Sequence, residues 1–431
     1  MESVSSYRQK IQFVIGFAGS GKSTKLAASC KDKPEVLVLT PTHKAAMVLK
    51  NKGITNVYTI HSALKLIPTI NENARKGQKL QRLKKIGETD MSTIKMVALD
   101  EFSMVPTNIM DLLLEVLPED AKVMVFGDAS QLPPVDGEPI DPEQYTDNIL
   151  RLTTQHRAKA PHVVETFMRF HHYIENPTGQ ANLVVSPNYP DLCKGTLKDF
   201  NPATDRILAY TNQRVIELNA QASIMLGKEK AICYGEDILI NQLSGKLSWS
   251  DGGMMLWPGM IAKGRLMDDT ERDKARIKIE DTLAKWDTDI PYRQTSVDVD
   301  GEQYTIYYDY EHYATSKKLK AAVYEAQDQL VRIHKLSKEV HIPTWCKENR
   351  GATGIRERGA AWSAYLTHQN HVFDVRRPYA STCHKAQGQE FSTVFIDQED
   401  MKKAVRNGYY EGYARLMYVA LSRAINKVVI L

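Results

Sequence analysis

The segment Gly16–Ser23 constrains this chain more than any other, because its sequence GFAGSGKS matches the pattern GxxxxGK[ST]. It follows the apolar run Ile11–Ile15 and precedes a helical pattern. In that setting glycines let backbone N–H groups approach phosphates, and the helix N-terminus adds partial positive charge. We therefore predict a nucleotide-binding loop in which Lys22 reaches the β- and γ-phosphates and Ser23 holds Mg²⁺.

Apolar runs of strand length recur after this loop, at Val36–Leu39, Met96–Leu99 and Val123–Phe126, with helical patterns between them. Their continuous hydrophobicity predicts parallel strands buried on both faces, and the alternation predicts an α/β fold. A second α/β set begins near Arg206, breaks off, and resumes at Ala380. The sequence therefore predicts two α/β lobes, the second of which is interrupted by an insertion.

The inserted residues 235–375 have a different sequence pattern from the two lobes. Alternating residues flank Asp300-Gly301, which predicts a β-hairpin at that dipeptide. The charged stretch Ser316–Lys338 predicts a long helix with a solvated face. We expect Trp345, Trp362, Tyr365 and Phe373 to pack this insertion rather than to stack on bases.

Composition narrows the class of protein further. Of the 431 residues, 42% are hydrophobic and 25% are charged, which is typical of a soluble globular protein. The net charge of +4 is small, so a nucleic-acid site would need locally clustered basic groups. The five cysteines are scattered without a CxxC pair, which argues against a disulfide framework or zinc site and favours a reducing compartment. We expect no membrane association.

Acidic and amide side chains follow two of the predicted strands. Asp100 and Glu101 directly follow Met96–Leu99, where Asp100 suits the Mg²⁺ shell and Glu101 suits the activation of water. Gln131 follows the next strand, where its amide can contact both a γ-phosphate and the second lobe. These residues predict hydrolysis of Mg-ATP.

Read together, nine segments resemble superfamily 1 helicases of the subgroup that contains RecD and Dda. In chain order they are GFAGSGKST, TPTHKAA, TIHSAL, LDEFSM, GDASQLPPV, LTTQHR, AYTNQRVIELN, STCHKAQGQEF and YVALSRA. The resemblance implies an α/β fold of two RecA-like lobes with ATP and Mg²⁺ between them. The first lobe would comprise residues 1–63 and 94–204, and the second residues 205–234 and 376–431. Residues 64–93 would form a strand-separating pin, and residues 235–375 a larger subdomain that is partly β and SH3-like.

The same resemblance assigns roles to residues of the nucleotide site. Gln131 looks like the γ-phosphate sensor, and Arg157 and Arg423 resemble two arginine fingers from the facing lobe. Together with Lys22 and Glu101, these three form the predicted catalytic set. The predicted nucleotide-binding residues are Gly16, Gly19, Gly21, Lys22, Ser23, Thr24, Gly388 and Glu390. Of these, Glu390 resembles the residue that contacts the nucleotide sugar.

Other matched segments resemble strand-contacting motifs. The residues expected to contact DNA are Pro41, Thr42, His43, Lys44, Thr59, His61, Thr382, His384 and Gln387. The pin region contains no aromatic residue, so a wedge would be aliphatic, with Ile67, Ile70, Leu80 and Leu83 as candidates. Its basic run, residues 75–85, is either a solvated helix or a phosphate-facing patch. Four other histidines are expected to be structural: His156, His171, His172 and His312.

The resemblance implies an ATP-dependent DNA helicase that moves 5′-to-3′ on single-stranded DNA in replication, recombination or repair. We expect a monomer in the cytosol of a bacterial or phage-infected cell, acting on single strands and duplex junctions. Single-strand-binding or other replication proteins are candidate partners. An RNA helicase and a translocase with little unwinding remain alternatives. A P-loop kinase and a non-catalytic DNA-binding adaptor fit the residues less well.

Overall fold

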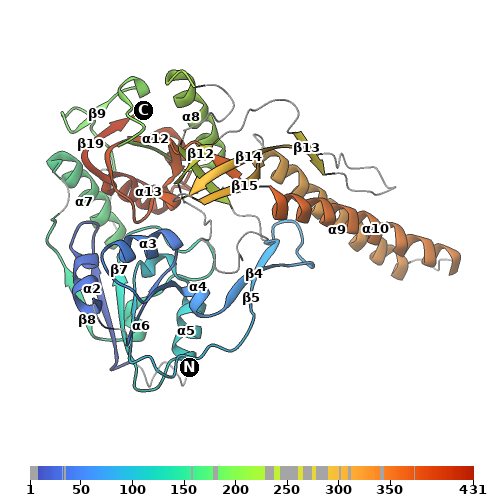
Figure 1. Cartoon of the computed structure of the whole chain (residues 1–431), viewed down its shortest axis with the longest axis horizontal. Helices are drawn as coiled ribbons and strands as arrows, with labels where there is room; N and C mark the ends of the chain where they lie inside the picture. The colour runs from blue at the N-terminus through green and yellow to red at the C-terminus, as the bar shows by residue number, and fades with distance from the viewer. Residues whose placement is uncertain are drawn as a thin grey trace. The chain divides into compact units, whose positions relative to one another are not determined.

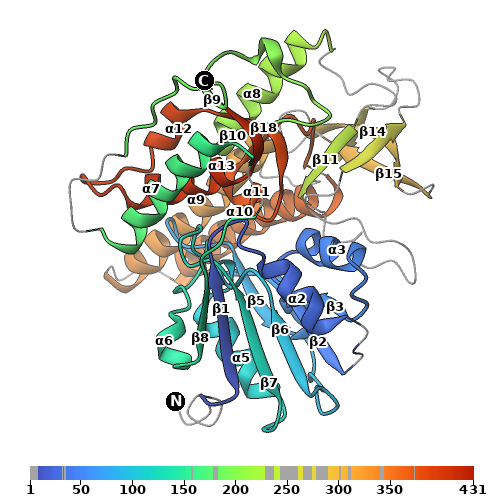
Figure 2. The ribbon, with the colours of Figure 1, turned by 90° about the vertical axis from the view of Figure 1, so that its left-hand side faces the viewer.

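Six parallel strands form the first sheet, in the order β3-β2-β6-β7-β1-β8 (Figures 1 and 2). Their bounds are β1 (Ile11–Gly16), β2 (Val36–Thr40), β3 (Val57–Thr59), β6 (Met96–Leu99), β7 (Lys122–Gly127) and β8 (Ile149–Leu152). One face packs on α2 (Lys22–Cys30) and α3 (His43–Asn51). The other face packs on α4 (Ile60–Ala63), the 3-10 turn η1 (Phe102–Met104), α5 (Thr107–Val116) and α6 (Pro142–Tyr145). Burial on both faces explains the continuous apolar runs and confirms the predicted α/β fold.

Five parallel strands form the second sheet, in the order β17-β10-β18-β19-β9. Their bounds are β9 (Leu192–Lys194), β10 (Arg206–Ala209), β17 (Ala380–Thr382), β18 (Phe391–Ile396) and β19 (Ala424–Ile430). One core cluster joins this sheet to α7 (Pro161–Glu175), α11 (Cys383–Ala386), α12 (Gln398–Lys402) and α13 (Glu411–Ser422). The opposite face packs on η2 (Leu197–Asp199) and α8 (Asn212–Met225).

Helix α7 and strand β9 lie with the second sheet, although we expected all residues up to 204 in the first lobe. Strand β9 pairs in parallel with β19, with Leu192 opposite Val428. Helix α7 contributes Val163, Phe167 and Phe170 to the core cluster that contains α13. A three-residue strand carries too short a pattern to reveal which sheet it joins, so the predicted boundary at residue 204 was wrong.

The chain divides into two compact units, one of which holds both parallel sheets and comprises Met1–Ile67, Lys85–Lys228 and Pro378–Leu431. The other unit comprises Pro68–Lys84 and Glu229–Arg377. Its strands are β11 (Asp237–Gln242), β12 (Ile261–Arg265), β13 (Lys274–Ile277), β14 (Ile290–Val299), β15 (Glu302–Tyr308) and β16 (Asp374–Arg376), paired antiparallel. Val299 of β14 pairs with Glu302 of β15, which confirms the hairpin predicted at Asp300-Gly301.

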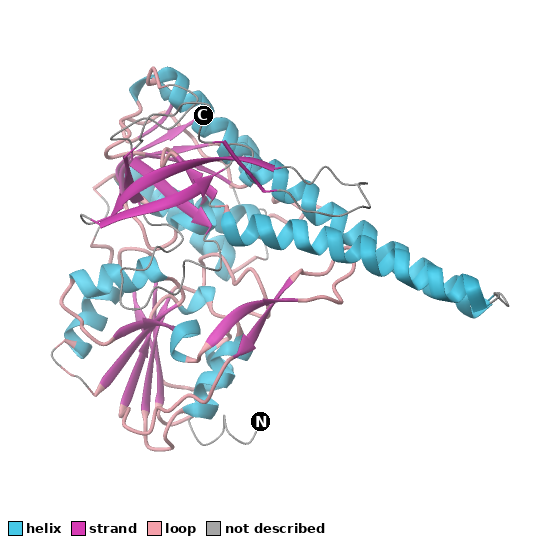
Figure 3. Cartoon of the chain, turned by 45° about the vertical axis from the view of Figure 1, so that its right-hand side comes forward, coloured by secondary structure: helices cyan, strands magenta, loops and turns pink. Residues whose placement is uncertain are grey.

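Two long helices belong to the second unit, α9 (His312–Glu339) and α10 (Thr344–His371) (Figure 3). Helix α9 confirms the helix predicted for Ser316–Lys338. Trp362 and Tyr365 are buried in the cluster between α9 and α10, as expected for packing residues. Phe373 and the side chain of Trp345 lie outside the described part of the chain.

The basic run of residues 75–85 belongs to a β-hairpin rather than to a helix. Its strands are β4 (Leu66–Ile70) and β5 (Gln81–Lys85), which pair with each other. Ala74 and Leu80 are buried against α9 and α10. Gln327 Nε2 also donates a hydrogen bond of 2.8 Å to the carbonyl oxygen of Glu72. The helix alternative was therefore wrong, because tertiary contacts with α9 and α10 override the local pattern.

The computed structural model describes residues 8–31, 33, 35–156, 159–177, 183–228, 237–242, 261–265, 274–277, 290–299, 302–308, 312–339, 344–372 and 374–431. Within these residues no helix combines the length and apolar character needed to cross a membrane.

Candidate active site

The predicted phosphate loop lies between β1 and α2 and wraps around a lysine. Lys22 is the first residue of α2, and its Nζ donates hydrogen bonds to the carbonyl oxygens of Gly16 (2.6 Å) and Phe17 (3.0 Å). Gly19 has a φ of +86°, and a Cβ there would lie 2.0 Å from Gln155 Oε1. Only glycine tolerates this conformation and this close approach. The loop is therefore shaped by its backbone, as a site for phosphate requires.

A pocket of about 310 Å³ opens above this loop. It brings together predicted residues from loops of both sheets: Gly19, Gly21, Lys22, Ser23, Thr24, Glu101, Gln131, Gly388, Glu390 and Arg423. Gly16 does not line it, although its carbonyl oxygen accepts a hydrogen bond from Lys22. Asp100 lies behind the lining residue Glu101 and is only 6% exposed. Arg157 lies outside the described residues.

The two acidic residues after β6 are held in an electrostatically costly arrangement. Burial and the neighbouring Glu101 carboxylate raise the pKa of Asp100. Glu101 has a φ of +52°, which is strained for a residue with a Cβ, and its buried Oε2 accepts no hydrogen bond. Adjacent carboxylates with unused acceptor capacity are suited to a divalent cation.

Ser23 and Asp100 are therefore a chemically reasonable protein contribution to a Mg²⁺ site. Among the described residues no group of three or more His, Cys, Asp and Glu side chains forms a metal cluster. Mg²⁺ in nucleotide sites uses few protein ligands and takes the others from phosphates and water, so this sparse set fits it.

Gln131 and Arg423 approach the pocket from different sheets. Gln131 follows β7 and is 2% exposed, and its Nε2 lies 3.4 Å from Asp128 Oδ2. Arg423 directly follows α13 and is also 2% exposed. Its Nη2 donates to Ser422 Oγ at 2.9 Å, and its Nη1 lies 3.4 Å from the carbonyl oxygen of Gln389. These bonds fix the guanidinium beside the pocket, where it can meet phosphoryl charge.

The predicted DNA-contacting segments share one local design, in which a threonine after a parallel strand caps a helix. Thr42 Oγ1 accepts from the Ala45 N–H at the start of α3, and Thr59 and Thr382 cap α4 and α11 in the same way. Strands β2 and β3 are neighbours, with Thr40 opposite Thr59, so the first two segments follow adjacent strand ends. Each threonine hydroxyl can still donate its own hydrogen to a phosphate oxygen.

Burial changes the charge of the side chains in these segments. It lowers the pKa of His43, His61 and His384, so these imidazoles are neutral at pH 7. Burial, with a contribution from Arg206, lowers the pKa of Lys44 to about 8. The histidines are thus suited to hydrogen bonding, and Lys44 is the residue of this group that can supply charge.

One predicted DNA-contacting residue also touches the nucleotide site. Gln387 Nε2 lies 3.5 Å from Gln131 Oε1, so the two amides meet between the segments that follow β17 and β7. Pro41 completes the first segment, next to Thr42. The geometry therefore connects the second-sheet segment to the pocket directly.

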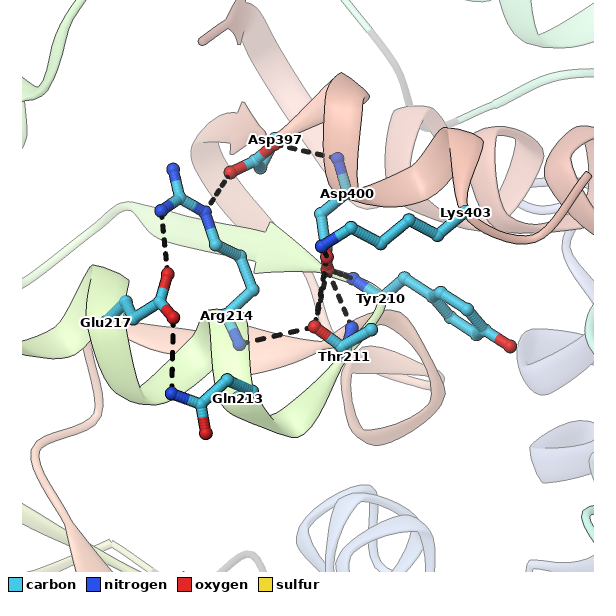
Figure 4. A network of polar contacts seen from close by, with 8 residues as sticks. All are labelled: Tyr210, Thr211, Gln213, Arg214, Glu217, Asp397, Asp400 and Lys403. Atoms are coloured by element: carbon cyan, nitrogen blue, oxygen red, sulfur yellow. Dashed lines mark hydrogen bonds and ion pairs between the residues drawn. The ribbon is translucent and has the colours of Figure 1, made fainter.

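A polar network holds the segment after β10 in place (Figure 4). Asp400 accepts hydrogen bonds from the backbone N–H groups of Tyr210 (2.9 Å) and Thr211 (2.7 Å), and from Lys403 Nζ (2.7 Å). Burial alone would raise the pKa of Asp400, but the bonds from Lys403, Thr211 and Tyr210 lower it. Arg214 adds an ion pair of 2.5 Å with Asp397. This network anchors the start of α8 and positions Tyr210 beside His384, with ring centroids 6.4 Å apart.

Five residues that line the pocket are absent from the predicted set: Ala18 and Ser20 inside the phosphate loop, and Val48, Lys52 and His156 outside it. His156, which we expected to be structural, donates its backbone N–H to the carbonyl oxygen of Gly19 at 2.9 Å, and its ring lies next to Gly21 of the loop. Its position directly before Arg157, inside the segment LTTQHR, was the signal that could have identified it. Val48 and Lys52 lie on and just after α3, and no local pattern marks them.

Comparison with known proteins gives two matching family models, an AAA domain over residues 1–172 and a UvrD-like helicase C-terminal domain over residues 378–431. The ATP-dependent DNA helicase Dda of Enterobacteria phage T4 is 25% identical over 447 residues, covering 95% of this chain and 92% of that protein. An uncharacterized protein of Acanthamoeba polyphaga mimivirus is 30% identical over 158 residues, covering 31% of each chain. Among solved structures, the Pif1 helicase from Candida albicans has a TM-score of 0.47 at 17% identity, covering 100% of this chain and 93% of that one.

The two family models and the similarity to Dda agree with the ordered motifs and with the pocket that those motifs form. The first family model spans the phosphate loop and the carboxylates, and the second spans the segments around His384 and Arg423. The similarity to Dda extends over nearly the whole of both chains. The ordered motifs, the pocket and these matches together support a superfamily 1 helicase of the Dda type.

Proposed function

We propose that this protein hydrolyses Mg-ATP in the pocket above the phosphate loop and uses the reaction to move along single-stranded DNA. The observation that carries the proposal is the composition of the pocket. Lys22, Glu101 and Gln131 from the first sheet line it together with Arg423 from the second. A site built from two sheets can change shape when the γ-phosphate is cleaved.

The predicted residues of the nucleotide site have distinct roles in this reaction. Lys22 and the loop N–H groups bind the phosphates, and Glu101 accepts a proton from the attacking water. Gln131 contacts the γ-phosphate, while Arg423, with Arg157, stabilises charge on the transferred group. Mg²⁺ held by Ser23 and Asp100 would neutralise phosphate charge. Glu390 and Gly388 complete the site beside the nucleotide sugar.

The segments after β2, β3 and β17 are proposed to bind the DNA backbone. Threonine hydroxyls, neutral imidazoles and the Lys44 ammonium suit contacts with phosphate and sugar, which do not depend on base sequence. The contact of 3.5 Å between Gln387 and Gln131 supports a direct link from this surface to the nucleotide. We further propose 5′-to-3′ movement, in line with the RecD/Dda subgroup, a monomeric enzyme, and a role in replication, recombination or repair.

Substitution of the proposed base tests this reaction. We expect Glu101→Gln to bind ATP normally but to lower DNA-stimulated turnover by at least about 100-fold, because general-base catalysis is lost. The measurement is steady-state ATPase activity with saturating single-stranded DNA, alongside binding of a fluorescent ATP analogue. Glu115→Gln is the matched control, because Glu115 is an exposed residue of α5. Wild-type turnover in Glu101→Gln would remove Glu101 from the mechanism.

A further inference from the structure

Two side chains on one face of α13 bind the segment Asp128–Gln131, which follows β7. Arg415 Nη1 donates to the carbonyl oxygens of Ala129 (2.6 Å) and Gln131 (2.8 Å). Its Nε donates to Glu411 Oε1 at 2.9 Å, one helical turn earlier, which orients the guanidinium. Tyr418 lies three residues after Arg415, and residues at this spacing share a helix face.

The Tyr418 hydroxyl joins two loops of the first sheet. It donates to Asp128 Oδ2 at 2.5 Å and accepts a hydrogen bond of 3.1 Å from the N–H of Ala18 in the phosphate loop. Tyr418 is fully buried and Asp128 is 1% exposed, so water does not compete for these bonds. Asp128 Oδ1 also accepts from the Ser130 N–H at 3.0 Å.

The ring of Tyr418 is fixed as firmly as its hydroxyl. It stacks on His171 of α7, with centroids 5.7 Å apart, and meets Phe167 edge-on at 5.9 Å. His171 Nδ1 in turn lies 2.8 Å from Ser130 Oγ. A buried polar network with every member bonded specifies one arrangement of the parts that it connects.

The connected parts are those that must be aligned for phosphoryl transfer. Helix α13 ends at Ser422 and Arg423 follows it, so the position of the helix sets the position of the guanidinium. Asp128 lies 3.4 Å from the amide nitrogen of Gln131, so the same network also orients this side chain. Tyr418 itself does not line the pocket.

We propose that Tyr418 is a positioning residue for ATP hydrolysis. Its hydroxyl, together with Arg415, locks α13 to the phosphate loop and to Asp128–Gln131, so that Arg423 and Gln131 reach the γ-phosphate at the same time. The inference rests on the proposed function of the pocket and adds the residue that aligns its two halves. A group that acts only on this alignment affects the transition state more than ground-state binding.

Tyr418→Phe tests the proposal, because it removes the hydroxyl and keeps the ring. We expect kcat of the DNA-stimulated ATPase to fall about 10- to 100-fold, as for other small misplacements of catalytic groups, while KM for ATP stays within about threefold. Affinity for ADP should be unchanged, and affinity for ADP with aluminium fluoride, which mimics the transition state, should fall with kcat.

Tyr413→Phe is the matched control. Tyr413 lies on the same helix, is 4% exposed, and accepts a hydrogen bond of 2.8 Å from Gln398 Nε2. The Tyr413→Phe variant therefore loses a comparable buried hydroxyl, but one that does not contact the phosphate loop. Its kcat should match that of the wild type. Equal kcat in wild type, Tyr418→Phe and Tyr413→Phe would overturn the inference while leaving the proposed function intact. Equal losses of ADP and ADP–aluminium fluoride affinity in Tyr418→Phe would overturn it as well.

Arg415→Ala provides a second variant should Tyr418→Phe fail to fold. Arg415 is only partly buried, and this substitution removes its hydrogen bonds to the carbonyl oxygens of Ala129 and Gln131. We expect the same fall in kcat, with unchanged affinity for ADP. Wild-type kcat in Arg415→Ala would then contradict the inference. A wild-type protein without DNA-stimulated ATPase activity would overturn the proposed function and, with it, the role of Tyr418.

Discussion

Burial decides which single side chains carry charge on the proposed DNA-binding surface. His43, His61 and His384 are kept neutral at pH 7 by their lowered pKa values. Lys44 has a pKa of about 8, because burial and, to a smaller extent, the positive charge of Arg206 disfavour its ammonium form. Phosphate binds the ammonium form, so the contribution of Lys44 should be present below pH 8 and should fade as the pH rises.

We therefore predict that DNA binding weakens between pH 7 and pH 9 because Lys44 loses its proton. With a pKa of about 8, its charged fraction in the free protein falls from about nine-tenths to about one-tenth. Lys44→Arg should remove this dependence, because arginine stays charged. Fluorescence anisotropy with labelled single-stranded DNA at constant ionic strength measures this dependence of affinity on pH.

The control is Lys50→Arg, because Lys50 is an exposed residue of α3, and this variant should keep the wild-type pH profile. Parallel profiles for wild type and Lys44→Arg would contradict the assignment.

At the scale of elements, the aliphatic residues of the β4–β5 hairpin differ in burial, so some pack in the core and others are accessible to a DNA duplex. Leu80 is 5% exposed and packs against α9 and α10, so it is a structural residue and not a free wedge. Ile67 and Ile70 on β4 are half-buried, whereas Leu83 on β5 is 45% exposed, so Leu83 has the most accessible side chain of the four wedge candidates. Every residue of β5 is exposed, so its basic side chains are available to a nucleic-acid backbone.

We expect Leu83→Ala to impair strand separation without impairing movement on single strands. An apolar side chain that opens a base step acts only at a duplex junction. Unwinding of a forked duplex should slow about threefold or more, and single-strand-stimulated ATPase activity should be unchanged. Ile86→Ala is the control, because Ile86 is 46% exposed and lies just beyond β5. Equal unwinding rates for all three proteins would exclude Leu83 as the wedge.

Elements with a strong local signal were predicted from the sequence, and elements defined by distant contacts were not. The strands around Gly16 and Asp100 are buried on both faces, so their composition reveals them. Strand β5 has the sequence QRLKK and no buried face of its own, so nothing local distinguishes it from a helix or loop. Its position depends on contacts of Ala74 and Leu80 with helices more than 200 residues later in the chain.

At the scale of the whole chain, the same distinction applies to the active site. Lys22 and Glu101 could be assigned because the phosphate loop and the strand-terminal carboxylates are local motifs. Arg423 could be placed only through resemblance, because the sequence does not show which loops of the two sheets meet. The link between Ala18, Asp128 and Tyr418 spans 400 residues and required the structure.

Strand separation on tailed duplexes tests the central claim most directly. Two matched DNA duplexes, one with a 5′ single-stranded tail and one with a 3′ tail, are incubated with the protein, Mg²⁺ and ATP, with Glu101→Gln as the inactive control. The account predicts that the wild-type protein opens only the 5′-tailed duplex and that Glu101→Gln opens neither. Opening of only the 3′-tailed duplex would contradict the proposed direction, and failure to open either would contradict the proposed helicase activity itself.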